Sequence, residues 1–300
     1  MLLTEFIAAA TARLEHIYPT AEARAIVLTL CEHVIGTKSY THIVEPKYVI
    51  VPARLPLLES DLSRLAQGEP IQYVTGHSGF CGLDFRVSRD VLIPRPETEL
   101  LCREAIKIGG RFHRMRIPYG KKAVPVRVLD LCTGSGCIAW VMALSVQGAR
   151  VVGIDNSEAA LKVARSQDFS AQLKEAGAEA PDFVKADVLA EEITYDGGPF
   201  DLILSNPPYI KESEMSQMRR NVLDYEPASA LFVPDADPLL YYRAIAAWSR
   251  KFLSPEGFGI TEINETLGPD TEAVFRSAGF PSTELIKDFY DKKRFVLYHR

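Results

Sequence analysis

The sequence predicts an α/β protein in which a small helical domain precedes a parallel sheet. Two observations predict this arrangement. From Val126 onward, short apolar runs alternate with helical patterns, as in parallel sheets with helical crossovers. Earlier in the chain, apolar residues first recur at helical spacing and then alternate as in a β-hairpin. We therefore expect a helical domain over residues 1–75, a hairpin linker over 76–91 and the main domain over 92–300.

Three helices are predicted in the N-terminal domain. Apolar residues recur at steps of three and four from Leu3 to Ile17, and a second helix begins at Thr20 and ends at Gly36. Prolines interrupt the pattern between Tyr40 and Pro56. A third helix follows from Leu57 to Gln67, before Gly68. These helices predict a small bundle.

Four strands are predicted in the main domain, over Val126–Leu131, Arg150–Asp155, Phe183–Asp187 and Phe200–Ser205, of which the first and last are predicted to be buried. A glycine-bearing loop, Cys132–Gly136, separates the first strand from a helix over Cys137–Gln147. Ser157 is expected to cap one further helix that reaches about Glu175. Because the strands are expected to be parallel, their carboxyl ends meet at one edge of the sheet.

Composition indicates a soluble globular protein. The 300 residues are 47% hydrophobic and 24% charged, and the net charge of −5 disfavours a nucleic acid partner. Five cysteines form no C-x-x-C pair, so we expect free thiols in a reducing compartment. The first residues lack a basic region, and no apolar run approaches membrane-spanning length. We expect a cytoplasmic protein with no membrane partner.

Polar residues follow each predicted strand at the same edge of the sheet. Gly134 and Gly136 allow a ligand to approach the backbone closely, and Asp155 stands where a carboxylate accepts hydrogen bonds from a ribose. Asp187 is expected beside an adenine. The loop lacks the third glycine of a dinucleotide fingerprint, and Asp130 would repel a pyrophosphate. The pattern therefore favours S-adenosylmethionine, whose amino and sulfonium groups suit an acid.

The stretch Asn206-Pro207-Pro208-Tyr209 ends the fourth strand. The two prolines lack backbone N–H groups, so the Asn206 side-chain oxygen and the Pro207 carbonyl present acceptors without competing donors. Such a pair matches the two N–H donors of an uncharged NH₂ group, and Tyr209 is expected to offer a flat face for stacking. An ordinary strand end with a proline turn is the simpler alternative.

Two further stretches precede the first strand. Pro94-Arg95-Pro96 holds a cation rigidly before a helix whose first turn carries two acids, which is otherwise only a helix start. The stretch from Lys107 to Arg127 contains seven basic residues and no acid. It is predicted to be a solvated loop, with a contact patch for an RNA-bearing or acidic partner as the alternative.

With these motifs in view, the chain resembles the HemK/PrmC family, methyltransferases that modify the glutamine of the Gly-Gly-Gln motif in peptide chain release factors. The resemblance covers nearly the whole chain. It rests on Gly68–Gly76, Leu92–Glu99, Leu129–Ala139, Asp155, Asp187, Ser205–Ile210, Glu226-Pro227 and Ala230-Leu231.

The resemblance implies a class I S-adenosylmethionine-dependent methyltransferase fold, with seven strands of which the last is antiparallel. It implies that the helical domain recognises the release factor, and it assigns site residues without a metal. The cofactor-binding residues are Cys132, Thr133, Gly134, Ser135, Gly136, Asp155, Asp187, Val188 and Asn206. The acceptor amide is held by Asn206, Pro207, Pro208 and Tyr209, with Asn206, Pro207 and Tyr209 as catalytic residues.

Three positions depart from the family pattern. Glycine often stands at the position of Cys132, the basic stretch after Lys107 looks like an insertion, and a glycine often occupies the position of Asn264. Two other functions stay open on the residues alone. An N6-adenine methyltransferase acting on DNA or RNA would meet the same acceptor pair, and a donor-sensing module would bind without transfer. We expect a monomeric enzyme acting on release factors.

Overall fold

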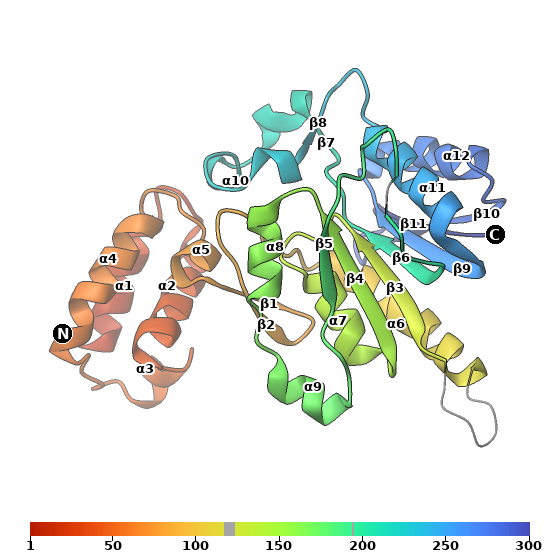
Figure 1. The fold of residues 1–300 in the computed structure, drawn as a ribbon. Coiled ribbons are helices and arrows are strands. Elements are labelled where there is room, and N and C mark those ends of the chain that lie inside the picture. The colour runs from red at the N-terminus through yellow and green to blue at the C-terminus, as the bar shows by residue number, and fades with distance from the viewer. Residues whose placement is uncertain (117–123, 194) are drawn as a thin grey trace. The chain divides into compact units, whose positions relative to one another are not determined.

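A seven-stranded sheet lies at the centre of the larger of two units in the computed structural model, which describes residues 1–116, 124–193 and 195–300 (Figure 1). The strand order is β10-β11-β9-β6-β3-β4-β5. The strands are β3 Val126–Leu131, β4 Ala149–Asp155, β5 Asp182–Lys185, β6 Phe200–Ser205, β9 Leu253–Glu262, β10 Ser282–Lys287 and β11 Lys293–His299. Two short strands, β7 Ile210–Lys211 and β8 Phe232–Val233, pair separately.

The direction of the strands creates a binding edge. β3 pairs in parallel with both β4 and β6, and β9 continues the parallel set beyond β6. The last strand, β11, is antiparallel to β9 and β10, as the resemblance implies. From β3 the chain runs outward through β4 and β5 and then returns to β6 on the other side of β3. Such a reversal opens a crevice at the carboxyl ends of the strands.

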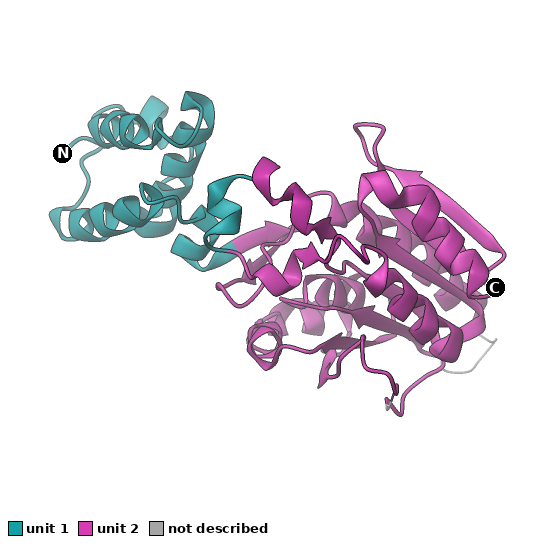
Figure 2. Cartoon of the chain, turned by 90° about the horizontal axis from the view of Figure 1, so that it is seen from above, with its two compact units in different colours: residues 1–77, 218–225 teal, residues 78–217, 226–300 magenta. Residues whose placement is uncertain are grey.

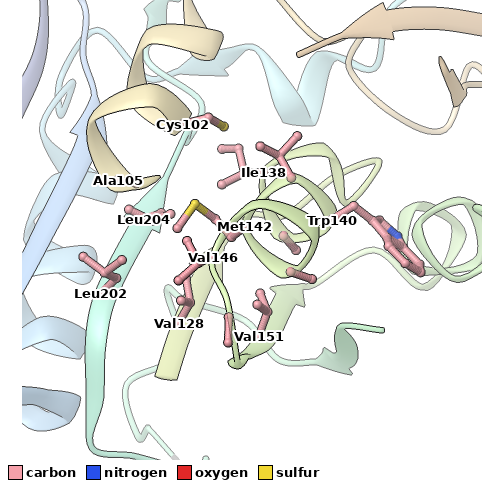
Figure 3. Close-up of a cluster of buried hydrophobic side chains, with 14 of the residues drawn as sticks. Cys102, Ala105, Val128, Ile138, Trp140, Met142, Val146, Val151, Leu202 and Leu204 are labelled. Carbon is pink, nitrogen blue, oxygen red and sulfur yellow. The ribbon is translucent and has the colours of Figure 1, made fainter. Parts of the chain in front are cut away.

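Helices cover both faces of this sheet. On one face, α6 Thr98–Met115 and α7 Cys137–Ser145 pack against side chains such as Val128 and Leu202 (Figure 3). On the other, α11 Leu240–Phe252 and α12 Gly268–Ser277 pack in a second core that contains Leu129. Neighbouring residues of β3 thus enter opposite cores, because side chains alternate along a strand. The double cover explains why nearly every residue of β3 and β6 is buried.

The chain divides into two compact units, residues 1–77 with 218–225, and residues 78–217 with 226–300 (Figure 2). The smaller unit contains α1 Leu3–Leu14, α2 Thr20–Ile35, α3 Thr41–Val44, η1 Pro52–Arg54, α4 Leu55–Leu65, α5 Ile71–Thr75 and α10 Arg220–Leu223. Residues 218–225 belong to the smaller unit, whereas the expected domain boundaries place them in the main domain.

The apolar stripes of the three predicted N-terminal helices meet in one core. Gly36 ends α2 in the left-handed conformation, with φ of 72°. Arg64 makes two hydrogen bonds of 2.9 Å to Glu69 and also donates to the carbonyls of Tyr73 and Val74. The buried Glu69 carboxylate of the Gly-Glu-Pro motif thus holds Arg64, which binds carbonyls near the end of α5.

The hairpin forms as predicted, with β1 His77–Phe80 and β2 Leu83–Arg86. Phe80 and Phe85 lie in the first core of the larger unit. The helix predicted from Ser157 to Glu175 is wrong in extent, because it divides into α8 Glu158–Arg165 and α9 Ser170–Ala176. Its predicted cap is confirmed, since Ser157 accepts a hydrogen bond from the Ala160 N–H.

The basic stretch is not a loop over its first part. Lys107, Arg111 and Arg114 belong to α6, and Lys121 and Lys122 lie outside the described residues. Arg116 makes two short hydrogen bonds to the buried Asp201, at 2.6 and 2.7 Å, and the same carboxylate accepts the Arg127 backbone N–H. The Arg116 guanidinium therefore serves the fold, whereas Arg127 contacts Asp201 through its backbone. The remaining elements are η2 Glu212–Gln217, η3 Ala228–Ala230 and η4 Glu265–Leu267.

The described residues contain neither a membrane-spanning helix nor a cluster of metal-binding side chains. Over residues 1–116, 124–193 and 195–300, every helix is too short or too polar to span a bilayer. Across the same ranges, His, Cys, Asp and Glu form no group of three or more suited to a metal ion.

Candidate active site

A cavity of about 910 Å³, including its open mouth, lies in the larger unit at the carboxyl edge of the sheet. It joins the ends of β3, β4 and β6 to the loop before α6. Eight of the predicted site residues line it, namely Cys132, Thr133, Gly134, Ser135, Asp155, Val188, Asn206 and Pro208. Four others, Gly136, Asp187, Pro207 and Tyr209, lie outside its wall. The structure thus has a pocket at the predicted edge of the sheet, and fewer residues line it than the sequence predicts.

The loop after β3 has the backbone shape that its glycines predict. Gly134 has φ of 54°, and a methyl group placed on it would meet no atom within 4 Å, so this side of the loop is open to a ligand. Cys132 has φ of 61°, a left-handed conformation that favours glycine. This explains why a glycine suits that position.

Gly136 and Gly153 have a packing role. A Cβ atom on Gly136 would lie 2.9 Å from the Phe183 ring, and one on Gly153 would lie 2.7 Å from both Phe183 and the Thr133 hydroxyl. Gly136 therefore lets α7 approach the sheet closely. It lies outside the cavity wall, and its direct contact with the cofactor stays a prediction.

Asp155 lies at the end of β4 in the cavity wall. Its carboxylate accepts hydrogen bonds of 2.9 Å from the backbone N–H groups of Gly134 and Ser157. Burial raises its pKa, while these N–H donors oppose the increase. Each carboxylate oxygen has a second acceptor site, so Asp155 can bind a diol while it holds the glycine loop in place.

Asp130 does not face the cavity, contrary to the expectation that it meets the cationic end of the donor. It is fully buried, and one oxygen accepts hydrogen bonds from the Thr133 hydroxyl at 2.5 Å and the Ala139 N–H at 3.2 Å. The other oxygen has no hydrogen-bond partner. Burial raises the pKa of Asp130 to about 7. The residue supports the loop from behind.

Asp187 is also displaced from its predicted place. β5 ends at Lys185, so Asp187 belongs to the turn that follows, where it is exposed and accepts a hydrogen bond from the Leu189 N–H. Its neighbour Val188 is buried and lines the cavity. The half-buried Tyr241, which sequence reasoning missed, lines the same cavity. Burial and nearby acidic groups raise the pKa of Tyr241 to about 12.

Asn206 enters the cavity wall at the end of β6. Its amide nitrogen donates to the Thr98 hydroxyl at 3.1 Å, and Thr98 in turn donates to Glu262 at 2.7 Å. Burial raises the pKa of Glu262, and its hydrogen bonds with Thr98 and Tyr209, together with the charge of Arg294, oppose that increase. Thr98 and Glu262 were not predicted, because no local pattern marks a buried threonine or glutamate as part of a site.

Tyr209 does not offer the free face that the sequence predicts. Its hydroxyl donates to Glu262 at 2.9 Å, and its ring packs against the second core. Burial and the neighbouring Glu262 charge raise its pKa well above the ordinary value for tyrosine. Tyr209 therefore anchors the strand end from outside the cavity.

The stiff loop before α6 forms the mouth of the cavity. Arg95 donates to Glu226 at 2.6 Å, and the Ile93 N–H donates to the other oxygen of that carboxylate at 3.2 Å. The Glu226 side chain is 1% exposed. Pro94, Arg95 and Pro227 line the cavity. The two proline-containing motifs are thus parts of one wall, joined by a buried carboxylate.

Comparisons with known proteins agree with this arrangement. A methyltransferase domain model matches residues 123–275, and a PrmC N-terminal domain model matches residues 5–76. The release factor glutamine methyltransferase of Bacteroides thetaiotaomicron is 36% identical over 289 residues, which cover 96% of each chain. That of Flavobacterium psychrophilum is 34% identical and covers 98% of this chain and 96% of its own. The chain belongs to the release factor glutamine methyltransferase family.

The fold of this family member is that of class I methyltransferases. Among solved structures, the catalytic domain of hMettl16 in complex with an RNA hairpin from the MAT2A 3′UTR matches with a TM-score of 0.54. It is 12% identical, and the match covers 80% of this chain and 81% of that domain. At this identity the likeness concerns the fold alone.

S-adenosylmethionine is the cofactor of this class, and the cavity suits it. The open side of Gly134 leaves room for a ligand against the loop, and Asp155 has free acceptor sites for the ribose hydroxyls. Ile138, Ala186 and Val188 give the wall an apolar part for the adenine ring. When bound, the cofactor supplies an activated methyl group. The residues of the chain bind it, orient it and limit its contact with water.

Proposed function

We propose that this enzyme transfers a methyl group from S-adenosylmethionine to the side-chain amide nitrogen of the Gly-Gly-Gln glutamine in peptide chain release factors. One observation carries the proposal: Asn206 lines the same cavity as Gly134 and Asp155. An acceptor held by Asn206 therefore shares an enclosed space with a donor held by the glycine loop. The names of the relatives support the choice of a release factor as substrate.

The chemistry requires positioning more than acid–base catalysis. A carboxamide nitrogen is a poor nucleophile, because its lone pair is delocalised into the carbonyl group. The Asn206 oxygen, which lines the cavity, and the carbonyl of Pro207, a neighbour outside the cavity wall, accept the two N–H groups of the glutamine and direct the nitrogen toward the methyl carbon. As the nitrogen becomes positively charged, these oxygens stabilise the charge. The departing proton passes to water.

The proposal includes the roles of the remaining predicted residues and domains. The loop from Cys132 to Gly136 holds the methionine part and ribose of the cofactor, with Gly136 acting through packing. Val188 contacts the adenine, and the turn at Asp187 positions Val188. Pro208 fixes the course of the acceptor wall. Residues 1–75 recognise the release factor, 76–91 join the domains, and 92–300 carry catalysis. The match of a PrmC N-terminal domain over residues 5–76 supports the first of these roles.

Transfer from radiolabelled S-adenosylmethionine to a purified release factor tests the proposal. The control substrate is the same release factor with alanine in place of the motif glutamine, which we expect to stay unlabelled. Asn206→Ala should abolish transfer while the dissociation constant of the donor changes by only a few-fold. Full activity of Asn206→Ala, or equal labelling of the control substrate, would exclude the proposed chemistry.

The proposal also names a monomer that acts in the cytoplasm on protein and not on nucleic acid. The Arg116 guanidinium of the basic stretch is paired with Asp201 inside the protein, which reduces the positive charge left for a phosphate backbone. Light scattering tests the monomer. An oligonucleotide offered in the same labelling assay tests the substrate class, and labelling of it in preference to the release factor would favour an adenine methyltransferase.

A further inference from the structure

A buried carboxylate lies behind the acceptor wall. Glu262 is the last residue of β9 and is 1% exposed. One of its oxygens accepts from the Thr98 hydroxyl at 2.7 Å, and the other accepts from the Tyr209 hydroxyl at 2.9 Å. Thr98, the first residue of α6, also contacts Asn206. One carboxylate thus joins three segments that are distant in the sequence.

The direction of these hydrogen bonds follows from counting protons. An ionised carboxylate only accepts, so the single hydroxyl proton of Thr98 is donated to Glu262. The Thr98 oxygen is then available only as an acceptor, and the Asn206 atom at 3.1 Å from it must be the NH₂ nitrogen. The two ends of an asparagine amide have nearly the same shape, so this chain of bonds is what distinguishes them.

We propose that Glu262, acting through Thr98, orients the Asn206 amide so that its oxygen, and not its NH₂ group, is presented to the acceptor. Both are positioning residues, because neither needs to touch the reacting atoms. The kinetic consequence rests on the proposed function, since an NH₂ group of the substrate needs an oxygen opposite it. With the amide reversed, two NH₂ groups would face each other and the acceptor would be repelled.

The first test compares Thr98→Val with Thr98→Ser. Valine keeps the shape but removes the hydroxyl, so the Asn206 amide loses its fixed orientation. We expect kcat for the release factor to fall on the order of 10- to 100-fold, with the donor dissociation constant changed less than about threefold. Serine keeps the hydroxyl and should retain most of the activity. Wild-type kcat in Thr98→Val, or an equal loss in Thr98→Ser, would overturn the inference.

Glu262→Gln gives a sharper test, because it should reverse the chain of bonds. With the glutamine oxygen accepting from Tyr209, its NH₂ group faces Thr98 and donates to it. Thr98 then donates its proton to the Asn206 oxygen, which turns the amide over. Every buried hydroxyl proton still has an acceptor, so the variant should fold with its unfolding midpoint near that of the wild type. We expect a loss of kcat similar to that of Thr98→Val, and a fully active Glu262→Gln would contradict the proposal.

An NMR measurement separates this inference from the proposed function. The side-chain NH₂ signals of Asn206, assigned by their loss in Asn206→Ala, should exchange slowly with solvent in the wild type and Thr98→Ser. They should exchange faster in Thr98→Val. If the wild type fails to methylate release factors, the proposed substrate is wrong but the exchange result still decides the orientation. Equal exchange rates in Thr98→Val and the wild type would overturn the orientation by Thr98.

Discussion

Asp130→Asn tests whether a buried acid behind the donor loop limits the stability of the enzyme. Burial raises the pKa of Asp130 from 3.8 to about 7, and only one of its oxygens is hydrogen-bonded. Between these pH values the folded chain binds a proton at this site that the unfolded chain has released. Stability from the protonated acid is therefore fully present below about pH 4 and is lost as the pH rises toward about 7.

The size of this effect follows from the linkage relation. Each pH unit inside the window corresponds to about 1.4 kcal/mol. From pH 5 to pH 8, roughly two units lie inside the window, so ionisation of Asp130 should cost on the order of 3 kcal/mol. Asparagine does not ionise and avoids this loss. The free energy of unfolding of Asp130→Asn should therefore rise relative to the wild type by about that amount between pH 5 and pH 8.

Urea denaturation at several pH values, without the donor, measures the difference. Both tryptophans, Trp140 and Trp248, lie in the cores of the larger unit, so their fluorescence reports the unfolding of that unit. The other titrating groups are shared by both proteins and largely cancel. Asp182→Asn, on an exposed side chain of β5, is the matched control and should show no such trend. A constant difference between Asp130→Asn and the wild type from pH 5 to pH 8 would refute the reasoning.

Two other substitutions test the packing of the site. Arg95→Ala leaves the Glu226 carboxylate buried without its cation. Because Arg95 is 32% exposed, we expect the free energy of unfolding in urea to fall by about 2 kcal/mol and donor binding to weaken in calorimetry. Unchanged values would contradict a role for this ion pair. Gly153→Ala places a methyl group 2.7 Å from Phe183 and should lower the free energy of unfolding by about 1–3 kcal/mol. The control Gly79→Ala, whose added methyl group meets nothing within 4 Å, should lower it less. Equal effects would speak against close packing of Gly153 on Phe183.

Local patterns in the sequence were sufficient for the main elements of the larger unit. The strands around Val128 and Ile203 are short and mostly apolar, and the helix boundary at Ser157 is marked by a capping side chain. The split of the next predicted helix was missed. Its second part is a separate short helix that begins at Ser170, a boundary that periodicity alone does not reveal.

The candidate site was predictable where its residues stand at strand ends. Gly134, Asp155 and Asn206 follow three parallel strands, so the order of the strands brings them to one edge. Val188 was placed through the family resemblance. Thr98 and Glu262 could not be found in this way, because they are 164 residues apart and each lies in an ordinary local pattern.

The sequence by itself determined which segments become strands and which polar side chains reach the carboxyl edge, since both depend on spacing within a few residues. Only the tertiary structure decided which way those side chains turn and what they bind. Asp130 enters the core and Asp155 lines the cavity, although both belong to neighbouring strands of one sheet. The physical reason is that a buried polar group must find its partners across the fold, and those partners are set by packing and not by nearness in the chain.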